Sequence, residues 1–337
     1  MKRMWTYVMG LGCNMWADKW TDPSGHPIQC EDEASRYYPT LSTDRAVWQR
    51  VVDELPSFGV NTVVIDLGEG VQYESHPELA VPGAWTKDEL RKEIARMRAM
   101  GLEVIPKLNF SARNDGWLGE YAYMLSTRKY YEVAKDLVGE VCELFDSPRL
   151  FHLGMNNESA PDHHGGMASI RTEELWWRDL YFFFNELEHY GTRPWIFSDY
   201  FLTRGEEWEK RMPKSCAQSN FHYERMLSKR PDGRYQQATV QAYVDLARLG
   251  YDQIPIASDW CFRQNFAQTV WLFLEEGMCD EHLLGFASAP WAHVSDMTYY
   301  TMLNNANRLK YAKAMYNDYH TIGRDALLAR IVAPNLS

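Results

Sequence analysis

The sequence lacks most features of membrane, nucleic-acid-binding or zinc-stabilised proteins. No apolar run approaches the ~20 residues that cross a bilayer. The net charge is −11 and no basic cluster is present, which argues against nucleic acid or an acidic membrane surface as a partner. The six cysteines are scattered without a CxxC pair, so we expect reduced, partly buried thiols rather than disulfides or a zinc site.

Two further absences concern export and cofactors. The opening stretch MKRMWTYVMGLGC has two basic residues and a short apolar run, but no small-residue cleavage site follows it. We interpret it as a first strand, in a protein that is cytoplasmic as written or exported with its signal already removed. The glycine fingerprint of a dinucleotide site is also missing, and we expect no cofactor. Nothing in the sequence indicates the oligomeric state.

Aromatic residues, by contrast, are abundant, with 13 Trp, 20 Tyr and 14 Phe. Their flat apolar faces and polar edges suit sugars and other ring-shaped ligands. A large aromatic core would account for them equally well until the rings are placed.

Apolar runs of strand length alternate with segments of helical period throughout the chain. The predicted strands are 5–12, 61–68, 102–110, 149–155, 193–200, 216–223, 253–260 and 283–291. The predicted helices are 43–59, 86–101, 127–145, 172–191, 205–212, 238–250, 266–278 and 300–319. Eight βα units without a change in composition predict an α/β fold, a single (β/α)8 TIM barrel spanning 1–337 as one domain. An open doubly wound sheet is the alternative.

In such a barrel the chemistry lies where strands run into the βα loops. The residues at these ends are carboxylates, amides and aromatic rings, a set typical of a sugar site. The predicted substrate-binding residues are Asp66, Asn109, Asp199, Tyr200, Asn220, Tyr223, Trp260 and Trp291. Any one of these carboxylates could instead cap a helix.

Glycosidic cleavage needs a protonated carboxyl group for the leaving oxygen and a second group opposite it. Glu158, at the end of the fourth predicted strand, is the candidate acid. Desolvation there would raise its pKa toward the working range of a general acid. The alternative is a solvated glutamate at the start of a loop.

Four short motifs resemble the barrel of family 20 β-N-acetylhexosaminidases: PKLNFSARNDGWL, FHLGMNNE, RPWIFSDYF and the closing APW. In that family the fourth strand ends in His-x-Gly-x-Asp-Glu. The resemblance implies that the Glu is the general acid and that the Asp orients the 2-acetamido group of the substrate. His152 and Gly154 match the motif, but Asn156 and Asn157 stand where the two carboxylates are expected.

This departure leaves three interpretations open. The chain could be an inactive form that still binds sugar, or the working pair could be Asn157 and Glu158, one residue further on. The Asn-Glu pair also resembles the strand-four end of retaining glycosidases of the large (β/α)8 clan, which implies Asp259 as a nucleophile. Because side chains alternate along a strand, Asn157 and Glu158 both face the barrel mouth only if the backbone is irregular there. The third interpretation is a different chemistry.

The sequence thus predicts a glycoside hydrolase acting on a terminal sugar, with N-acetylhexosamine a candidate, and with Glu158, Asn157, Asn156 and Asp259 as catalytic residues. Its expected partner is a carbohydrate. The alternatives are a non-catalytic sugar-binding barrel and a metal-dependent isomerase or aldolase with Glu158, Asp199, Glu224 and His222 as ligands. His163 and His164 form a weaker metal hypothesis, and no metal site is predicted.

Overall fold

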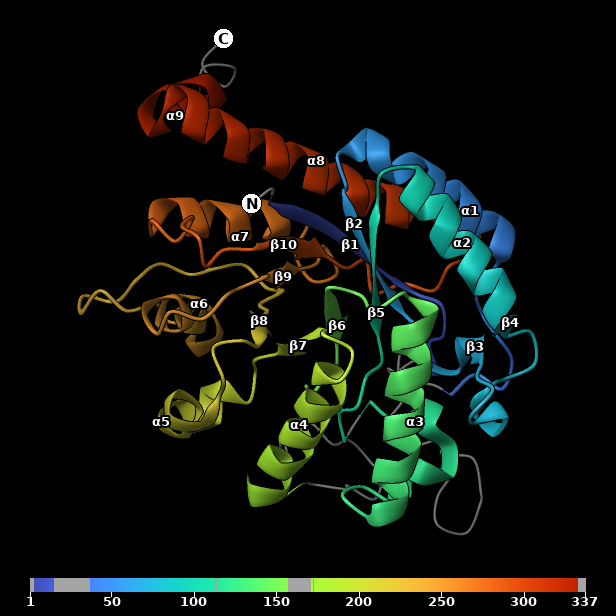
Figure 1. The fold of residues 1–337 in the computed structure, drawn as a ribbon. Helices are drawn as coiled ribbons and strands as arrows, with labels where there is room; N and C mark the ends of the chain where they lie inside the picture. The colour runs from blue at the N-terminus through green and yellow to red at the C-terminus, as the bar shows by residue number, and fades with distance from the viewer. Residues whose placement is uncertain (1–2, 15–36, 113, 157–170, 172, 333–337) are drawn as a thin grey trace.

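The structure is a computed structural model that describes residues 3–14, 37–112, 114–156, 171 and 173–332. Eight parallel strands form one sheet at its centre (Figure 1). They are β1 Met4–Gly10, β2 Thr62–Asp66, β5 Glu103–Lys107, β6 Leu150–His152, β7 Arg193–Phe197, β8 Ala217–Ser219, β9 Ile256–Ala257 and β10 Gly285–Ser288. Seven of them lie inside strands that the sequence predicts, and β1 begins one residue before its predicted strand, 5–12.

The sheet closes on itself between β8 and β9. Its strand order is β8-β7-β6-β5-β2-β1-β10-β9. The two terminal strands are joined by the parallel bridges Gln218↔Gln253 and Phe221↔Ile256. The amide of Ile256 donates to the carbonyl of Asn220 at 3.1 Å across this seam. The predicted (β/α)8 barrel is therefore confirmed, and the open doubly wound sheet is wrong, because such a sheet keeps two free edges.

Helices surround the sheet, as Figure 1 shows. They are α1 Arg45–Glu54, α2 Lys87–Ala99, α3 Arg128–Leu144, α4 Glu173–Glu188, α5 Phe201–Arg211, α6 Ala238–Arg248, α7 Asn265–Glu275, α8 Tyr299–Ile322 and α9 Arg324–Val332. The side chain of Asp44 caps α1, and Thr86 and Glu89 form a capping box at the start of α2. None of the described helices is long and apolar enough to cross a membrane.

The segment between β2 and α2 holds small elements that the sequence did not predict. Here β3 Val71–Gln72 pairs in parallel with β4 Trp85–Thr86. Short 3-10 turns lie at Gly68–Gly70 and Pro77–Leu79, and others lie at Leu55–Phe58 and Gly116–Tyr123. Strands of two residues are too short to leave a periodic signal in the sequence.

Alternation along the strands divides the core into two layers. On β2, Val63 and Ile65 pack outward with the helices, whereas Val64 faces the barrel interior. The interior layer consists of Met4, Val8, Val64, Ile105, Leu150, Trp195, Phe197, Ala217, Ile254, Ile256, Ala287 and Ala289. Because this cluster fills the barrel, a ligand can enter only above it, at the carboxyl ends of the strands.

Candidate functional site

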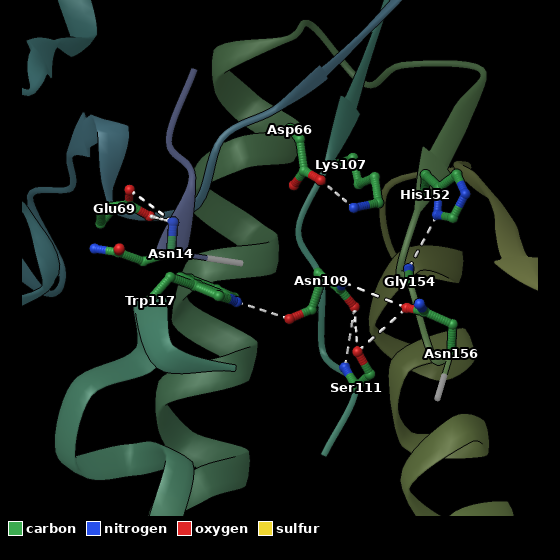
Figure 2. Close-up of polar contacts among 10 residues, drawn as sticks. All are labelled: Asn14, Asp66, Glu69, Lys107, Asn109, Ser111, Trp117, His152, Gly154 and Asn156. Atoms are coloured by element: carbon green, nitrogen blue, oxygen red, sulfur yellow. Dashed lines mark hydrogen bonds and ion pairs between the residues drawn. The ribbon is translucent and has the colours of Figure 1, made fainter. Parts of the chain in front are cut away.

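A buried ion pair lies at the carboxyl ends of β2 and β5 (Figure 2). Lys107 Nζ bonds Oδ2 of Asp66, and each side chain is 2% exposed. Burial raises the pKa of Asp66, and the neighbouring Lys107 opposes that rise. Oδ1 of Asp66 has no hydrogen-bond partner among the described residues. One oxygen of Asp66, a predicted sugar ligand, is thus already paired with Lys107.

His152 lies beside this pair as a neutral ring. Burial lowers its pKa well below the usual value, and the charge of Lys107 lowers it further. The amide of Gly154 donates to Nδ1 at 3.0 Å, so the ring proton resides on Nε2. The imidazole packs against Trp195 and Phe197 with ring centroids 4.7 and 4.6 Å apart. Its environment suits a filled barrel core rather than proton transfer.

The chain leaves β6 through an irregular backbone. Gly154 has φ +73° and Met155 has φ +64°, two consecutive left-handed residues. A Cβ on Gly154 would lie 2.0 Å from Oδ1 of Asn109, so glycine is required here for two reasons. Strand alternation therefore ends before Asn156, which is the irregularity that the shifted Asn157-Glu158 pair needs. Asn157 and Glu158 themselves, like His163 and His164, lie outside the described residues.

Asn156 belongs to a cluster of neutral polar groups with Asn109 and Ser111. Its Oδ1 accepts from Nδ2 of Asn109 at 3.3 Å and lies 3.3 Å from Oγ of Ser111. Oδ1 of Asn109 accepts from the Ser111 amide at 3.2 Å and from the Ser111 hydroxyl at 2.6 Å. Trp117 donates its indole N–H to the Asn109 carbonyl at 2.7 Å. All of these contacts are visible in Figure 2. The sequence singled out Asn109 and Asn156 but not Ser111, which lies two residues after Asn109 and on the same side.

Glu69, in the turn after β2, connects two loops of the mouth. Its Oε1 accepts from the amides of Cys13 at 2.7 Å and Asn14 at 3.0 Å, and Figure 2 shows the contact with Asn14. Burial raises the pKa of Glu69, the two amides oppose the rise and the charge of Asp66 adds to it. Both carboxylate oxygens are thus engaged by backbone or lie against Gly12, so Glu69 shapes the mouth.

Asp259, the candidate nucleophile, is bonded to the outer ring of helices. Oδ1 accepts from Nδ2 of Asn305 at 2.6 Å, and Oδ2 lies 3.2 Å from Nε of Arg308. Both partners are on α8, and Asn305 also accepts from the Ser288 hydroxyl of β10 at 2.8 Å. To attack a sugar, this carboxylate would have to leave its two partners on α8.

Aromatic rings gather on the side of the mouth formed by the β8, β9 and β10 ends. Tyr223 stacks on Phe221 at 5.3 Å and meets the edges of Trp260 at 6.4 Å and Trp291 at 6.2 Å. Trp260 is 65% exposed, which is unusual for so large an apolar ring. Burial raises the pKa of Tyr223 well above its usual value. The predicted Tyr223, Trp260 and Trp291 thus form one cluster, together with Phe221, which the sequence did not single out.

The remaining predicted ligands lie in other surroundings. Tyr200 stacks on Trp176 of α4 at 4.4 Å, and Asn220 donates to the Thr239 carbonyl of α6 at 2.6 Å. Both contacts belong to the packing of helices on the barrel. Asp199 is half-buried near Tyr223, whose pKa its charge raises further. Asp199 is therefore the predicted carboxylate that lies with the aromatic cluster.

The ligands proposed for a metal do not converge within the described part of the chain. His222 bonds the Thr239 hydroxyl through Nδ1 at 2.9 Å, burial lowers its pKa, and Glu224 is exposed. Among the residues that the structure describes, no three His, Cys, Asp or Glu side chains are grouped to hold a metal ion.

No family model and no curated protein matches this sequence. Solved structures do match. Flavobacterium johnsoniae chitobiase has a TM-score of 0.57 at 17% identity, over 80% of this chain and 46% of that one. The β-N-acetylhexosaminidase of Bacteroides fragilis has a TM-score of 0.59 at 12% identity, over 91% of this chain and 65% of that one. PbGH5A, a family 5 glycoside hydrolase from Prevotella bryantii, has a TM-score of 0.52 at 12% identity, over 91% of this chain and 95% of that one.

The chain thus spans about half the length of the chitobiase and 65% of the Bacteroides enzyme. At such low identities the likeness is one of fold. The resemblance that the short motifs indicated is confirmed at that level, since the chain has the (β/α)8 barrel that these family 20 and family 5 glycoside hydrolases share.

Proposed function

We propose that this chain is a glycoside hydrolase that binds a terminal sugar at the carboxyl ends of its barrel strands. The observation that supports this most is the cluster of Tyr223, Trp260 and Trp291, with Trp260 exposed at the position where barrel enzymes bind substrate. An exposed indole beside a tyrosine offers a flat apolar face for a pyranose ring. Asp199 nearby can accept hydrogen bonds from sugar hydroxyls.

In this proposal Glu158 is the general acid that protonates the leaving oxygen. It follows the left-handed residues Gly154 and Met155, so the backbone leading to it is not bound to strand alternation. The second role falls to Asn157 or Asp259. The bonds from Asn305 and Arg308 to Asp259 favour Asn157, because Asp259 would lose two partners by moving to the substrate.

Release of nitrophenol from aryl glycosides tests the proposal. The panel holds N-acetylglucosaminides, N-acetylgalactosaminides and unsubstituted hexosides, and the proteins are the wild type, Glu158→Gln and Glu206→Gln. Glu206 is an exposed residue of α5 and serves as the matched control. We expect turnover by the wild type and the control and a loss of about a hundredfold or more in Glu158→Gln, since general acid catalysis contributes ~10²–10⁴-fold. Equal turnover by all three proteins would refute the role of Glu158.

A non-catalytic sugar-binding barrel is the second candidate, and one observation favours it. Three described carboxylates near the mouth are already engaged: Asp66 by Lys107, Glu69 by two backbone amides and Asp259 by α8. Binding of sugars without turnover of any glycoside, natural oligosaccharides included, would select this candidate over the first.

A further inference from the structure

The orientation of the Asn109 side chain is fixed by a backbone amide. The Ser111 N–H can only donate, and it lies 3.2 Å from one atom of the Asn109 amide group. That atom must therefore be Oδ1, and the Ser111 hydroxyl at 2.6 Å donates to it as well. Nδ2 of Asn109 consequently faces Asn156.

This fixes Asn156 in turn. Nδ2 of Asn109 can only donate, and the atom of Asn156 that lies 3.3 Å from it is Oδ1, which accepts. A flipped Asn156 would lose this bond and place two N–H donors against each other, with only the Ser111 hydroxyl oxygen at 3.3 Å as an acceptor. Nδ2 of Asn156 therefore faces away from Asn109, and it donates no hydrogen bond to any described residue.

The charges near this amide are neutralised. Lys107 is paired with Asp66, His152 is neutral, and Arg171 pairs with Asp179 at 3.2 Å. No unpaired cation stands ready here, among the residues that the structure describes, to bind a carboxylate. The surroundings suit a neutral acceptor oxygen such as a sugar hydroxyl.

We propose that Asn156 is a specificity-determining residue that donates its Nδ2–H to a neutral acceptor oxygen of the bound sugar. The inference rests on the proposed function, because it requires a sugar in the mouth. It also means that Asn156 does not accept a hydrogen bond from the N–H of an acetamido group, as a carboxylate at this position could. The preference for a sugar with an acceptor oxygen at this position then follows from a chain of hydrogen bonds that begins at the Ser111 backbone amide.

Deoxy and deoxyfluoro sugars test this directly, because fluorine accepts a hydrogen bond weakly but cannot donate one. Methyl glycosides of glucose, galactose and N-acetylglucosamine are first titrated calorimetrically to find the sugar that binds. For that sugar, each hydroxyl is replaced in turn by fluorine or hydrogen. At one ring position the wild type should bind the fluoro form about threefold more tightly than the deoxy form, the size of a weak hydrogen bond.

Two variants should reverse that preference by different routes. Asn156→Asp replaces the donor with an acceptor. Asn109→Asp, whose side chain would lie against Ser111 and Asn156, accepts from Asn156 Nδ2, so Asn156 turns its Oδ1 toward the sugar. Asn61→Asp is the matched control, since its Oδ1 accepts from the Trp5 amide at 2.7 Å at the opposite end of the barrel. It should keep the wild-type preference, and thermal melting confirms that each variant is folded.

The outcomes separate the two proposals. No binding of any of the sugars overturns the proposed function and this inference with it. If Asn156→Asp and Asn109→Asp lower the affinity for the fluoro and deoxy sugars equally, the proposed function stands and the inference is refuted. A preference that reverses in both variants and persists in Asn61→Asp supports it.

Discussion

Gly154 is the residue on which the geometry of the β6 end depends. Its φ of +73° lies in the left-handed region, and the space of a Cβ is taken by Oδ1 of Asn109 at 2.0 Å. Gly191 offers a matched comparison, with φ +64° and nothing within 4 Å of a Cβ. The two glycines separate the cost of the backbone conformation from that of the contact.

We expect Gly191→Ala to lower the free energy of unfolding by about 1–2 kcal/mol, the usual cost of a left-handed alanine. Gly154→Ala should lower it by about 2–5 kcal/mol, because displacing Asn109 adds an overpacking cost of ~1–3 kcal/mol. Urea denaturation measures both values. Equal losses would mean that the Asn109 side chain yields freely and does not hold the amide cluster in place.

The loops after β1 and β2 are joined by a single buried carboxylate, Glu69. Its pKa is raised above 4.5, chiefly by burial, so the folded state holds the proton more tightly than the unfolded chain does. The stabilisation by this proton is complete below pH 4.5 and is lost as the pH rises through the raised folded-state pKa.

Compared with Glu69→Gln, the wild type should therefore lose relative stability as the pH increases from 4.5 toward neutrality. Urea denaturation at a series of pH values measures this difference. Glu78 provides a control of opposite sign, since burial raises its pKa but hydrogen bonds from Tyr121, its own backbone amide and His76 together lower it by more. For Glu78 the contribution is lost as the pH falls. If the difference in unfolding free energy between the wild type and Glu69→Gln does not change with pH, Glu69 is not a buried carboxyl group with a raised pKa.

At the level of elements, the sequence predicted the strands well but not the contacts that the side chains at their ends make. All eight barrel strands could be predicted because each is a continuous apolar run ended by turn residues. Side-chain partners were not predictable in the same way. Asp259 and Asn220 lie at strand ends as expected, yet they bond α8 and α6. Side chains alternate along a strand, and these two lie at positions that face the helices rather than the barrel interior.

The aromatic cluster could be predicted only in part. Tyr223, Trp260 and Trp291 were recognisable as rings at the ends of three strands, and their contacts form through barrel closure. Tyr200 has the same sequence signature but stacks on Trp176 of α4. Only the three-dimensional path of the loop after β7 distinguishes the two outcomes.

For the molecule as a whole, closure of the barrel rests on a seam of few hydrogen bonds. Across it, the amide of Gln218 donates to the Asp252 carbonyl at 2.8 Å and that of Ile256 to the Asn220 carbonyl at 3.1 Å. On the opposite side, the Leu67 amide donates to the Lys107 carbonyl at 3.0 Å. All belong to one continuous sheet.

If the seam opens only when the barrel unfolds, Gln218, Ile256 and Leu67 should exchange their amide protons at rates within about tenfold of one another, as expected for a single cooperative unit. Native-state hydrogen exchange followed by NMR measures these rates. Exchange about a hundredfold faster at Gln218 and Ile256 than at Leu67 would show that the barrel opens at β8 and β9 while the rest stays folded.

The crowding around Gly154 also says how sequences of this kind should be compared. Mutation can exchange an amide for a carboxylate at position 156 without moving the backbone, because the two side chains have nearly the same shape. It cannot place any side chain at position 154 without displacing Asn109. A search for distant relatives is therefore best anchored on the glycine, and the residues that follow it can then be compared position by position.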